Sequence, residues 1–238
     1  MGQLLINLSG LIVMWFVWWW LASRRFSLQT EFVIAVLGGL AVLPLVLVGR
    51  RLLEKQPDIQ QAERVTNWLH YALGTLLGAA LIGAVRLGMD STRWLLPLPV
   101  WLGVALMLLG GVIWGAVVFQ LALGGLGHRF AIGLTRSIAV DWFYAWTRNP
   151  MTLSALAFLV GVAIWLQSSL VLLWVLAIFL PVTMVFLKVY EERELEIRFG
   201  ERYLDYKDKT PWMLPTRRQP PVNGRESKSE HPQHLTRH

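Results

Sequence analysis

The chain has no cysteine, and this absence excludes disulfide bonds, thiolate metal sites and a cysteine nucleophile. Charged residues are also scarce: they make up 16% of the 238 residues, whereas hydrophobic residues make up 55%. A chain this apolar, with long hydrophobic runs, is typical of a membrane protein. Three of the five histidines, His231, His234 and His238, lie in a tail rich in Pro, Ser, Gln and charge, which we expect to be disordered and solvated. We therefore expect no metal site.

The formal net charge of +7 does not predict a nucleic-acid-binding protein. The Lys and Arg residues lie in the loops between apolar runs and in the C-terminal tail. Membrane proteins carry their cations in this way, because cytoplasmic loops are enriched in positive charge. We therefore expect the protein to lie in the lipid bilayer and not to bind nucleic acid.

Six hydrophobic segments approach the length of about 20 apolar residues that a membrane-spanning helix needs. They cover residues 4–22, 31–49, 67–86, 95–124, 152–166 and 169–190. Pro97 and Pro99 are expected at the membrane interface, so that the fourth span begins near Trp101. The sequence predicts an all-α, polytopic membrane helix bundle with about six segments and a cytoplasmic C-terminal helix.

The last two segments belong to one apolar run, from Leu153 to Tyr190, that is too long for a single crossing. The polar residues 167–169, Gln-Ser-Ser, are its only interruption. A helical hairpin that turns there would bring the regions near Pro150 and Glu191 to the same side of the membrane.

The positions of the cations predict the orientation of the bundle. With both termini in the cytoplasm, eighteen of the 22 Lys and Arg residues lie on the cytoplasmic side. The loops alone favour the same orientation, by seven to four. We therefore expect a multi-pass integral membrane protein with both termini cytoplasmic.

Small and ionisable residues inside the segments bear on packing and on function. Gly74 and Gly78, and likewise Gly111 and Gly115, are four residues apart and predict close contacts between helices. Ionisable side chains are nearly absent from the apolar runs before residue 124, and His70 is expected at the interface. This scarcity argues against an ion-coupled carrier.

Polar motifs flank the predicted hairpin at both ends. The first reads Tyr-Ala-Trp-Thr-Arg-Asn-Pro-Met over residues 144–151. Asn149 followed by Pro150 is typical of a helix start, and the free N–H groups of a helix start can bind a carboxylate. In the simplest structural interpretation this motif only begins a helix, and Arg148 only reaches the lipid headgroups.

The second motif begins with adjacent acids, Glu191 and Glu192. Glu191 is followed at intervals of four by Leu195, Phe199 and Tyr203, which places these side chains on one helix face. Two carboxylates suit a cationic ligand, although a solvated helix with a weak Glu194–Arg198 pair would also fit the pattern. An anion-binding helix start beside these acids would suit a zwitterionic amino acid with an added positive centre, such as S-adenosylmethionine.

The two motifs together resemble those of integral-membrane methyltransferases. The pattern is Tyr-Ala-Trp-x-Arg-(His/Asn)-Pro, an apolar hairpin, and Glu-Glu-x-x-Leu-x-x-x-Phe-Gly-x-x-Tyr-x-x-Tyr-x-x-x-x-Pro, over roughly residues 134–215. This group includes the isoprenylcysteine carboxyl methyltransferases and the phospholipid methyltransferases. The resemblance implies an enzyme that uses S-adenosylmethionine to methylate a lipophilic or small acceptor, a carboxylate, amine or thiol, reached from the bilayer.

The resemblance also implies the site and the domain organisation. The residues expected to bind the cofactor are Ser137, Ile138, Ala139, Tyr144, Arg148, Asn149, Pro150, Met151, Thr152, Glu191 and Glu192. Lys188 is expected to contact the substrate. No side chain is assigned as catalytic, because an in-line displacement from a sulfonium needs mainly alignment. The expected parts are N-terminal membrane helices (1–125), a methyltransferase-like region (126–215) and a disordered tail (216–238).

Several positions depart from the pattern of these families. Asn149 replaces a usual His, Thr152 a Tyr and Ser154 a Gly, while Leu187 stands where the carboxyl methyltransferases have an Arg. These differences leave the acceptor open. Two alternatives also stay open: an NADPH-dependent membrane reductase of the steroid-reductase type, and a non-enzymatic membrane carrier or assembly subunit.

Overall fold

The computed structural model describes residues 2–90, 95–123 and 140–214, and this part of the chain is helical, without a β-strand. The N-terminal helices are α1 (Gly2–Ser23), α2 (Leu28–Leu40), α3 (Val42–Lys55) and α4 (Ile59–Asp90). They are followed by α5 (Val100–Leu123), a 3₁₀ turn η1 (Trp142–Ala145) and α6 (Pro150–Trp165). The last elements are α7 (Ser169–Trp174), η2 (Val175–Phe179), α8 (Leu180–Val185), η3 (Phe186–Glu191), α9 (Glu192–Phe199) and α10 (Glu201–Lys209).

Helices occupy all six predicted segments, and the prediction of an all-α membrane bundle is confirmed. In the described part of the chain, four helical stretches are long and apolar enough to cross a membrane, and Asn7–Ser23 of α1 and α6 are shorter apolar stretches. The second segment is divided at Ala41 into α2 and α3, and the third is longer than predicted, since α4 extends from Ile59 to Asp90. The predicted tail and residues 124–139 lie outside the described residues.

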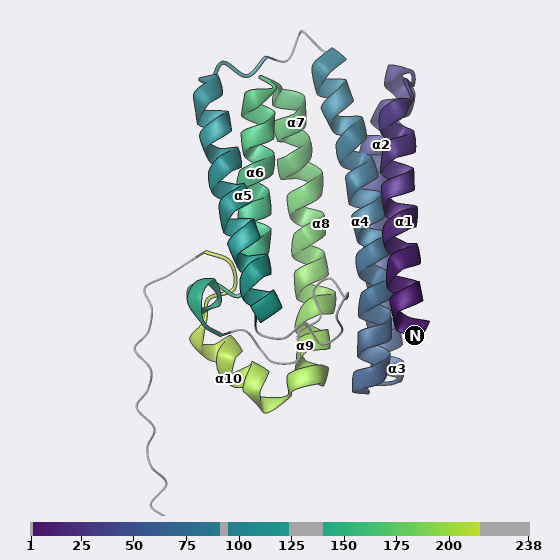
Figure 1. Ribbon diagram of the computed structural model, residues 1–238, viewed down its shortest axis with the longest axis vertical. Coiled ribbons are helices and arrows are strands. Elements are labelled where there is room, and N and C mark those ends of the chain that lie inside the picture. Colours follow the sequence, from purple (N-terminus) through teal and green to yellow (C-terminus); the bar gives the residue numbers. More distant parts are fainter. Residues whose placement is uncertain (1, 91–94, 124–139, 215–238) are drawn as a thin grey trace, which may run out of the picture.

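Elements α7 to α9 follow one another as a single long helical stretch, Ser169–Phe199. Two of its segments, η2 and η3, are π-helical turns. The stretch lies between the α5–α6 pair and α4 (Figure 1). Glu191 ends the second π turn, and a π turn inside an α-helix is often found at a functional site.

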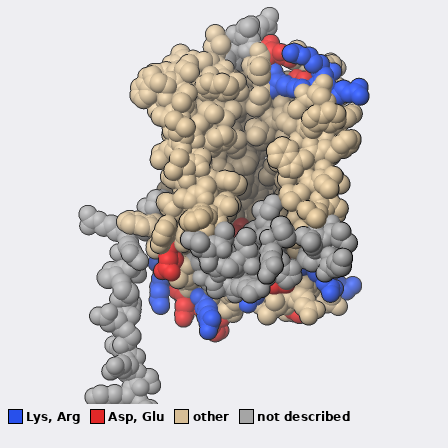
Figure 2. All heavy atoms as spheres, viewed as in Figure 1, with Lys and Arg blue, Asp and Glu red and all other residues tan. Residues whose placement is uncertain are grey.

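Two clusters of buried residues hold the bundle together. One joins α3, α4 and the second half of the long stretch, and includes Val46, Leu69 and Tyr190. The other joins α2, α4, α6 and α7, where the Trp174 indole N–H donates to the Ala35 carbonyl oxygen at 2.8 Å. Large apolar side chains such as Trp101 are exposed, as lipid around a helix bundle allows. The charged side chains visible in Figure 2 lie mainly toward the two ends of the molecule.

The predicted hairpin is present, with its turn at the predicted residues. Helix α6 ends at Trp165 and α7 begins at Ser169. Gln167 has a φ of 52°, and the Ser168 hydroxyl caps α7 by accepting from the Val171 N–H at 3.3 Å. Serine is among the residues preferred at a helix N-cap, which explains why the polar interruption turns the chain here.

Glycine contacts agree with one of the two predicted pairs. A Cβ at Gly78 would overlap the Trp18 ring, so α1 and α4 pack closely there. On α5, however, a Cβ at Gly115 would meet no described residue within 4 Å, and the close contact with α6 is made at Gly103 and Gly110. The prediction for Gly111 and Gly115 is wrong because these residues lie on a different face of α5 from Gly103 and Gly110.

Gly110→Ala should therefore destabilise the protein, by about 1–3 kcal/mol as is usual for overpacking. The new Cβ would lie 2.6 Å from the Ser154 carbonyl oxygen and 2.7 Å from the Phe158 nitrogen, both backbone atoms of α6. Gly115→Ala is the matched control, with open space around its Cβ. Thermal unfolding of the two variants in detergent is the measurement, and equal midpoints would contradict the assigned α5–α6 contact.

Candidate functional site

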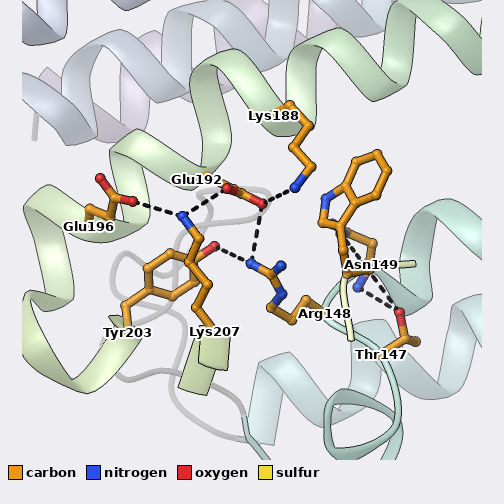
Figure 3. A network of polar contacts seen from close by, with 9 residues as sticks. Thr147, Arg148, Asn149, Lys188, Glu192, Glu196, Tyr203 and Lys207 are labelled. Carbon is orange, nitrogen blue, oxygen red and sulfur yellow. Dashed lines mark hydrogen bonds and ion pairs between the residues drawn. The ribbon is translucent and has the colours of Figure 1, made fainter. Parts of the chain in front are cut away.

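The two ends of the hairpin meet, as the sequence predicts. Arg148, just before α6, forms an ion pair with Glu192 at the start of α9, with Nη1 and Oε1 3.2 Å apart. Their side chains are only 10% and 13% exposed. The polar residues before and after the hairpin thus form one cluster at one end of the bundle (Figure 3).

The start of α6 has backbone donors without a capping side chain. Pro150 is the first helical residue and Asn149 is at the N-cap position, but the Asn149 side chain makes no capping hydrogen bond. It donates instead to the Trp212 carbonyl oxygen at 2.7 Å. In the described part of the chain, no group accepts a hydrogen bond from the backbone N–H of Met151 or Thr152. These two N–H groups are therefore available to a ligand.

The segment after α10 holds this helix start in place. Gly200, with a φ of 56°, separates α9 from α10, and a glycine adopts this left-handed conformation readily. The chain then returns beside α6 (Figure 1), where the Arg148 N–H donates to the Pro211 carbonyl oxygen at 3.0 Å. The Tyr206 hydroxyl donates to the Tyr144 carbonyl oxygen at 2.8 Å. Both contacts fix the loop before α6 from outside the hairpin.

Glu192 is the centre of a network of cations. Besides Arg148, the ammonium groups of Lys188 and Lys207 each lie 3.0 Å from one of its carboxylate oxygens (Figure 3). Lys207 also contacts Glu196 at 3.1 Å, and its hydrogen bond to Glu192 raises its pKa. Glu192 is therefore neutralised within the protein, and its role is to hold α9, α10 and the start of α6 together.

Glu191 differs sharply from its neighbour. No side chain in the described part of the chain forms an ion pair or a hydrogen bond with its carboxylate. It lines a cavity of about 250 Å³ together with Met151, Thr152 and Tyr144. Among the described residues, the cavity thus has a carboxylate without a cationic partner and two backbone N–H groups without an acceptor.

The structure brings most of the predicted cofactor residues to this cavity. Those that line it are Tyr144, Arg148, Asn149, Pro150, Met151, Thr152, Glu191 and Glu192. Lys188, the predicted substrate contact, is not among the lining residues; its ammonium group lies between Glu192 and the Trp212 ring, 4.3 Å from the ring centroid. Ser137, Ile138 and Ala139 lie outside the described residues.

A comparison with protein families gives a match at this part of the chain. Residues 98–202 match the family model described as phospholipid methyltransferase. This part of the chain is similar to the phospholipid methyltransferase family. Together with the apolar helices, this match indicates an integral membrane methyltransferase. No curated protein and no solved structure matches the chain.

The phospholipid methyltransferase match does not include helices α1 to α4, yet α4 contributes to the cavity wall. His70 and Thr66 line the cavity, and the His70 Nδ1 donates to the Thr66 carbonyl oxygen at 2.8 Å. With its proton on Nδ1, the neutral ring has an acceptor at Nε2. The sequence predicts only an interfacial position for His70. Its spacing of four residues from Thr66 does indicate that the two side chains share one face of the helix.

A second ion pair lies beside the cavity. Glu194 and Arg198 are 2.8 Å apart, and their side chains are only 4% and 5% exposed. The expectation of a solvated, weak pair is wrong here, because α9 packs against α4 and removes both side chains from water. The Thr66 hydroxyl shares a hydrogen bond of 2.8 Å with the Tyr190 hydroxyl and so adds a polar link between α4 and η3.

Three tyrosines at the cavity are neutral hydrogen-bonding groups. Burial, followed by the nearby Glu192 carboxylate, raises the pKa of Tyr203 to about 12. Burial also raises the pKa of Tyr144 and of Tyr206. At physiological pH all three therefore keep their hydroxyl protons, and the cavity carries no phenolate.

Proposed function

We propose that this membrane methyltransferase takes its methyl group from S-adenosylmethionine and transfers it to a lipophilic or small acceptor. The observation that carries the proposal is the pairing of two unsatisfied features in one cavity. Within the described chain, the Glu191 carboxylate has no cationic partner, and the start of α6 offers free N–H groups at Met151 and Thr152.

These features suit the two charged parts of the amino-acid end of the cofactor. The N–H groups at a helix N-terminus bind carboxylates, aided by the positive end of the helix dipole. A carboxylate such as Glu191 attracts an ammonium or a sulfonium group. Further donors await a partner, since Arg148 Nε and Trp212 Nε1 are buried without a hydrogen bond and both residues line the cavity.

When bound, S-adenosylmethionine supplies an activated methyl group on sulfur. The protein then has to align the acceptor with this methyl group and to exclude water. A carboxylate or thiolate acceptor needs no base for this displacement. An amine must be unprotonated at attack, and the Nε2 of His70 is an acceptor in the cavity wall that could take such a proton.

The acceptor would enter from the bilayer. Leu121, Phe186 and Leu187 line the cavity with apolar side chains, and the face of the molecule in Figure 2 is hollowed between its two groups of helices. A lateral path through this hollow explains why the reaction takes place in a membrane protein. Leu187 offers no charge to an acidic acceptor, whereas Lys188 beside the cavity is the cation that we propose as a substrate contact.

We also propose that both termini are cytoplasmic and that six segments lie in the membrane. This orientation is supported by the excess of Lys and Arg on that side. It places the cavity, and so the use of the cofactor, at the cytoplasmic end of the bundle.

Thermal unfolding of the purified protein in detergent tests the choice of cofactor. S-adenosylhomocysteine at about 100 times its Kd should stabilise the fold by about 2.7 kcal/mol, a rise of about 5–10 °C in Tm for a chain of this size. NADPH at the same concentration is the control and should have no effect. Protection by NADPH alone would favour a reductase, and protection by neither ligand would favour a non-enzymatic role.

A methyl-transfer assay then addresses the acceptor. Radiolabelled S-adenosylmethionine is incubated with the protein, a total lipid extract and small thiols, and the labelled product is separated by chromatography. Label in an organic-phase product supports a lipophilic acceptor, whereas label only in the aqueous phase points to a small one.

A further inference from the structure

A second polar cavity lies at the opposite end of the bundle from Glu191. Its volume is about 220 Å³, and it is formed where α1 ends, α2 begins and α4 ends (Figure 1). Basic and acidic side chains gather at this end beyond the apolar middle of the molecule (Figure 2). The residues that line the cavity are Ala22, Ser23, Arg25, Glu31, Arg86, Met89 and Asp90.

Glu31 is the unusual residue of this cavity. Its side chain is only 4% exposed, and its nearest cation is Arg86, with Nη1 3.6 Å from Oε1. The second carboxylate oxygen, Oε2, is buried and has no hydrogen-bond partner among the described residues. A buried acceptor left without a donor is unfavourable, and the cost is greater for a charged group.

Arg86 does not supply the missing donor, because its guanidinium group is used elsewhere. One terminal nitrogen, Nη2, donates to the Ala22 carbonyl oxygen at 2.6 Å, and the other donates to the Arg24 carbonyl oxygen. These carbonyl groups belong to the last turn of α1 and to the residue that follows it, where the chain offers no intrahelical donor. Arg86 therefore caps α1 and approaches Glu31 only at ion-pair distance.

Two further charged groups border the cavity without a partner. Within the described residues, neither Arg25 nor Asp90 forms an ion pair or a hydrogen bond through its side chain. Both are exposed. The cavity thus combines an unpaired cation, an unpaired surface carboxylate and a buried carboxylate oxygen that lacks a donor.

We propose that this cavity binds a zwitterionic headgroup that has a primary ammonium and a phosphate. The ammonium N–H groups would donate to Glu31 Oε2 and to the Asp90 carboxylate, and Arg25 would contact the phosphate. A quaternary ammonium has no N–H and cannot satisfy Glu31. Because the cavity lies at the end of an apolar bundle, at the level of the headgroups, the occupant is an ethanolamine phospholipid. This site is separate from the methyl-transfer cavity and does not depend on the proposed reaction.

Native mass spectrometry of the full chain in detergent tests this site. The protein is titrated with phosphatidylethanolamine and, in parallel, with phosphatidylcholine of the same acyl chains. We expect at least about tenfold tighter binding of the ethanolamine lipid, as one hydrogen bond to a charged group predicts. Glu31→Gln should remove that preference, and Glu54→Gln, at the other end of the bundle, should keep it.

Two surface variants keep the test decisive if Glu31→Gln does not fold. Asp90→Asn and Arg25→Gln change exposed residues, and each should weaken binding of the ethanolamine lipid by severalfold. Equal binding of the two lipids by the unaltered protein, or unchanged binding in all three cavity variants, would overturn the proposal. A further titration uses soluble glycerophosphoethanolamine, which has the same headgroup without acyl chains. If it binds as tightly as the lipid, the cavity recognises this headgroup but its occupant is a soluble molecule and not a phospholipid.

Discussion

Glu191→Ala should abolish measurable binding of S-adenosylhomocysteine while the protein still inserts into the membrane. In the proposed site Glu191 is the one carboxylate of the acidic pair that is free to meet the ammonium of this ligand. Truncating one partner of a buried charge pair costs about 2–5 kcal/mol, which lowers the affinity roughly 30-fold to several thousand-fold. Isothermal titration of the purified variant against the unaltered protein measures the loss.

The control for this variant is Glu201→Ala, which removes an exposed glutamate from α10. It should bind the ligand normally, and Glu191→Gln should resemble Glu191→Ala because it too lacks the charge. A normal isotherm for Glu191→Ala would refute the assignment of Glu191, even if the protein proved to be a methyltransferase by assay.

Glu194→Ala should cause the largest loss of stability among single substitutions at the site. It removes the carboxylate that lies 2.8 Å from the Arg198 guanidinium, and the Arg198 side chain is only 5% exposed. Breaking a buried ion pair in this way costs about 3–5 kcal/mol. Thermal unfolding in detergent measures the effect, and the midpoint should fall by roughly 6–20 °C for a chain of this length.

The Arg50–Glu54 pair provides a matched control, because its residues are also four apart on a helix. Its side chains are 32% and 51% exposed, so Glu54→Ala should change the stability by less than about 1 kcal/mol. A double variant, Glu194→Met with Arg198→Met, should recover much of the lost stability, since an apolar pair of similar size leaves no buried charge. Similar midpoints for Glu194→Ala and Glu54→Ala would show that the burial of this pair contributes little.

The sequence predicted the hairpin and the meeting of its ends because both depend on local information. An apolar run of known length, a polar interruption at 167–169 and a proline at position 150 each act through the residues beside them. Those features were enough to place Arg148 near the acids of α9, and the ion pair with Glu192 follows from that geometry. The helix start was predicted on the same grounds.

Other parts of the site could not be predicted from local patterns. Glu191 and Glu192 look alike in sequence, yet one is bound by three cations and the other by none in the described chain. The difference arises because α10 folds back after Gly200 and brings Lys207 to Glu192. His70 likewise reached the cavity only through the packing of α4 against the last helices.

By itself, then, the sequence determined the helical segments, the hairpin and the end of the bundle where the polar motifs meet. Hydrophobic length, prolines and polar breaks act over one or two helical turns, and they need no knowledge of the neighbouring helices. Tertiary structure decided which carboxylate stays free, which glycines touch a neighbouring helix and that Glu31 is buried with one oxygen unpaired. Those outcomes depend on the rotation of each helix about its axis, which is set by packing between segments far apart in the chain.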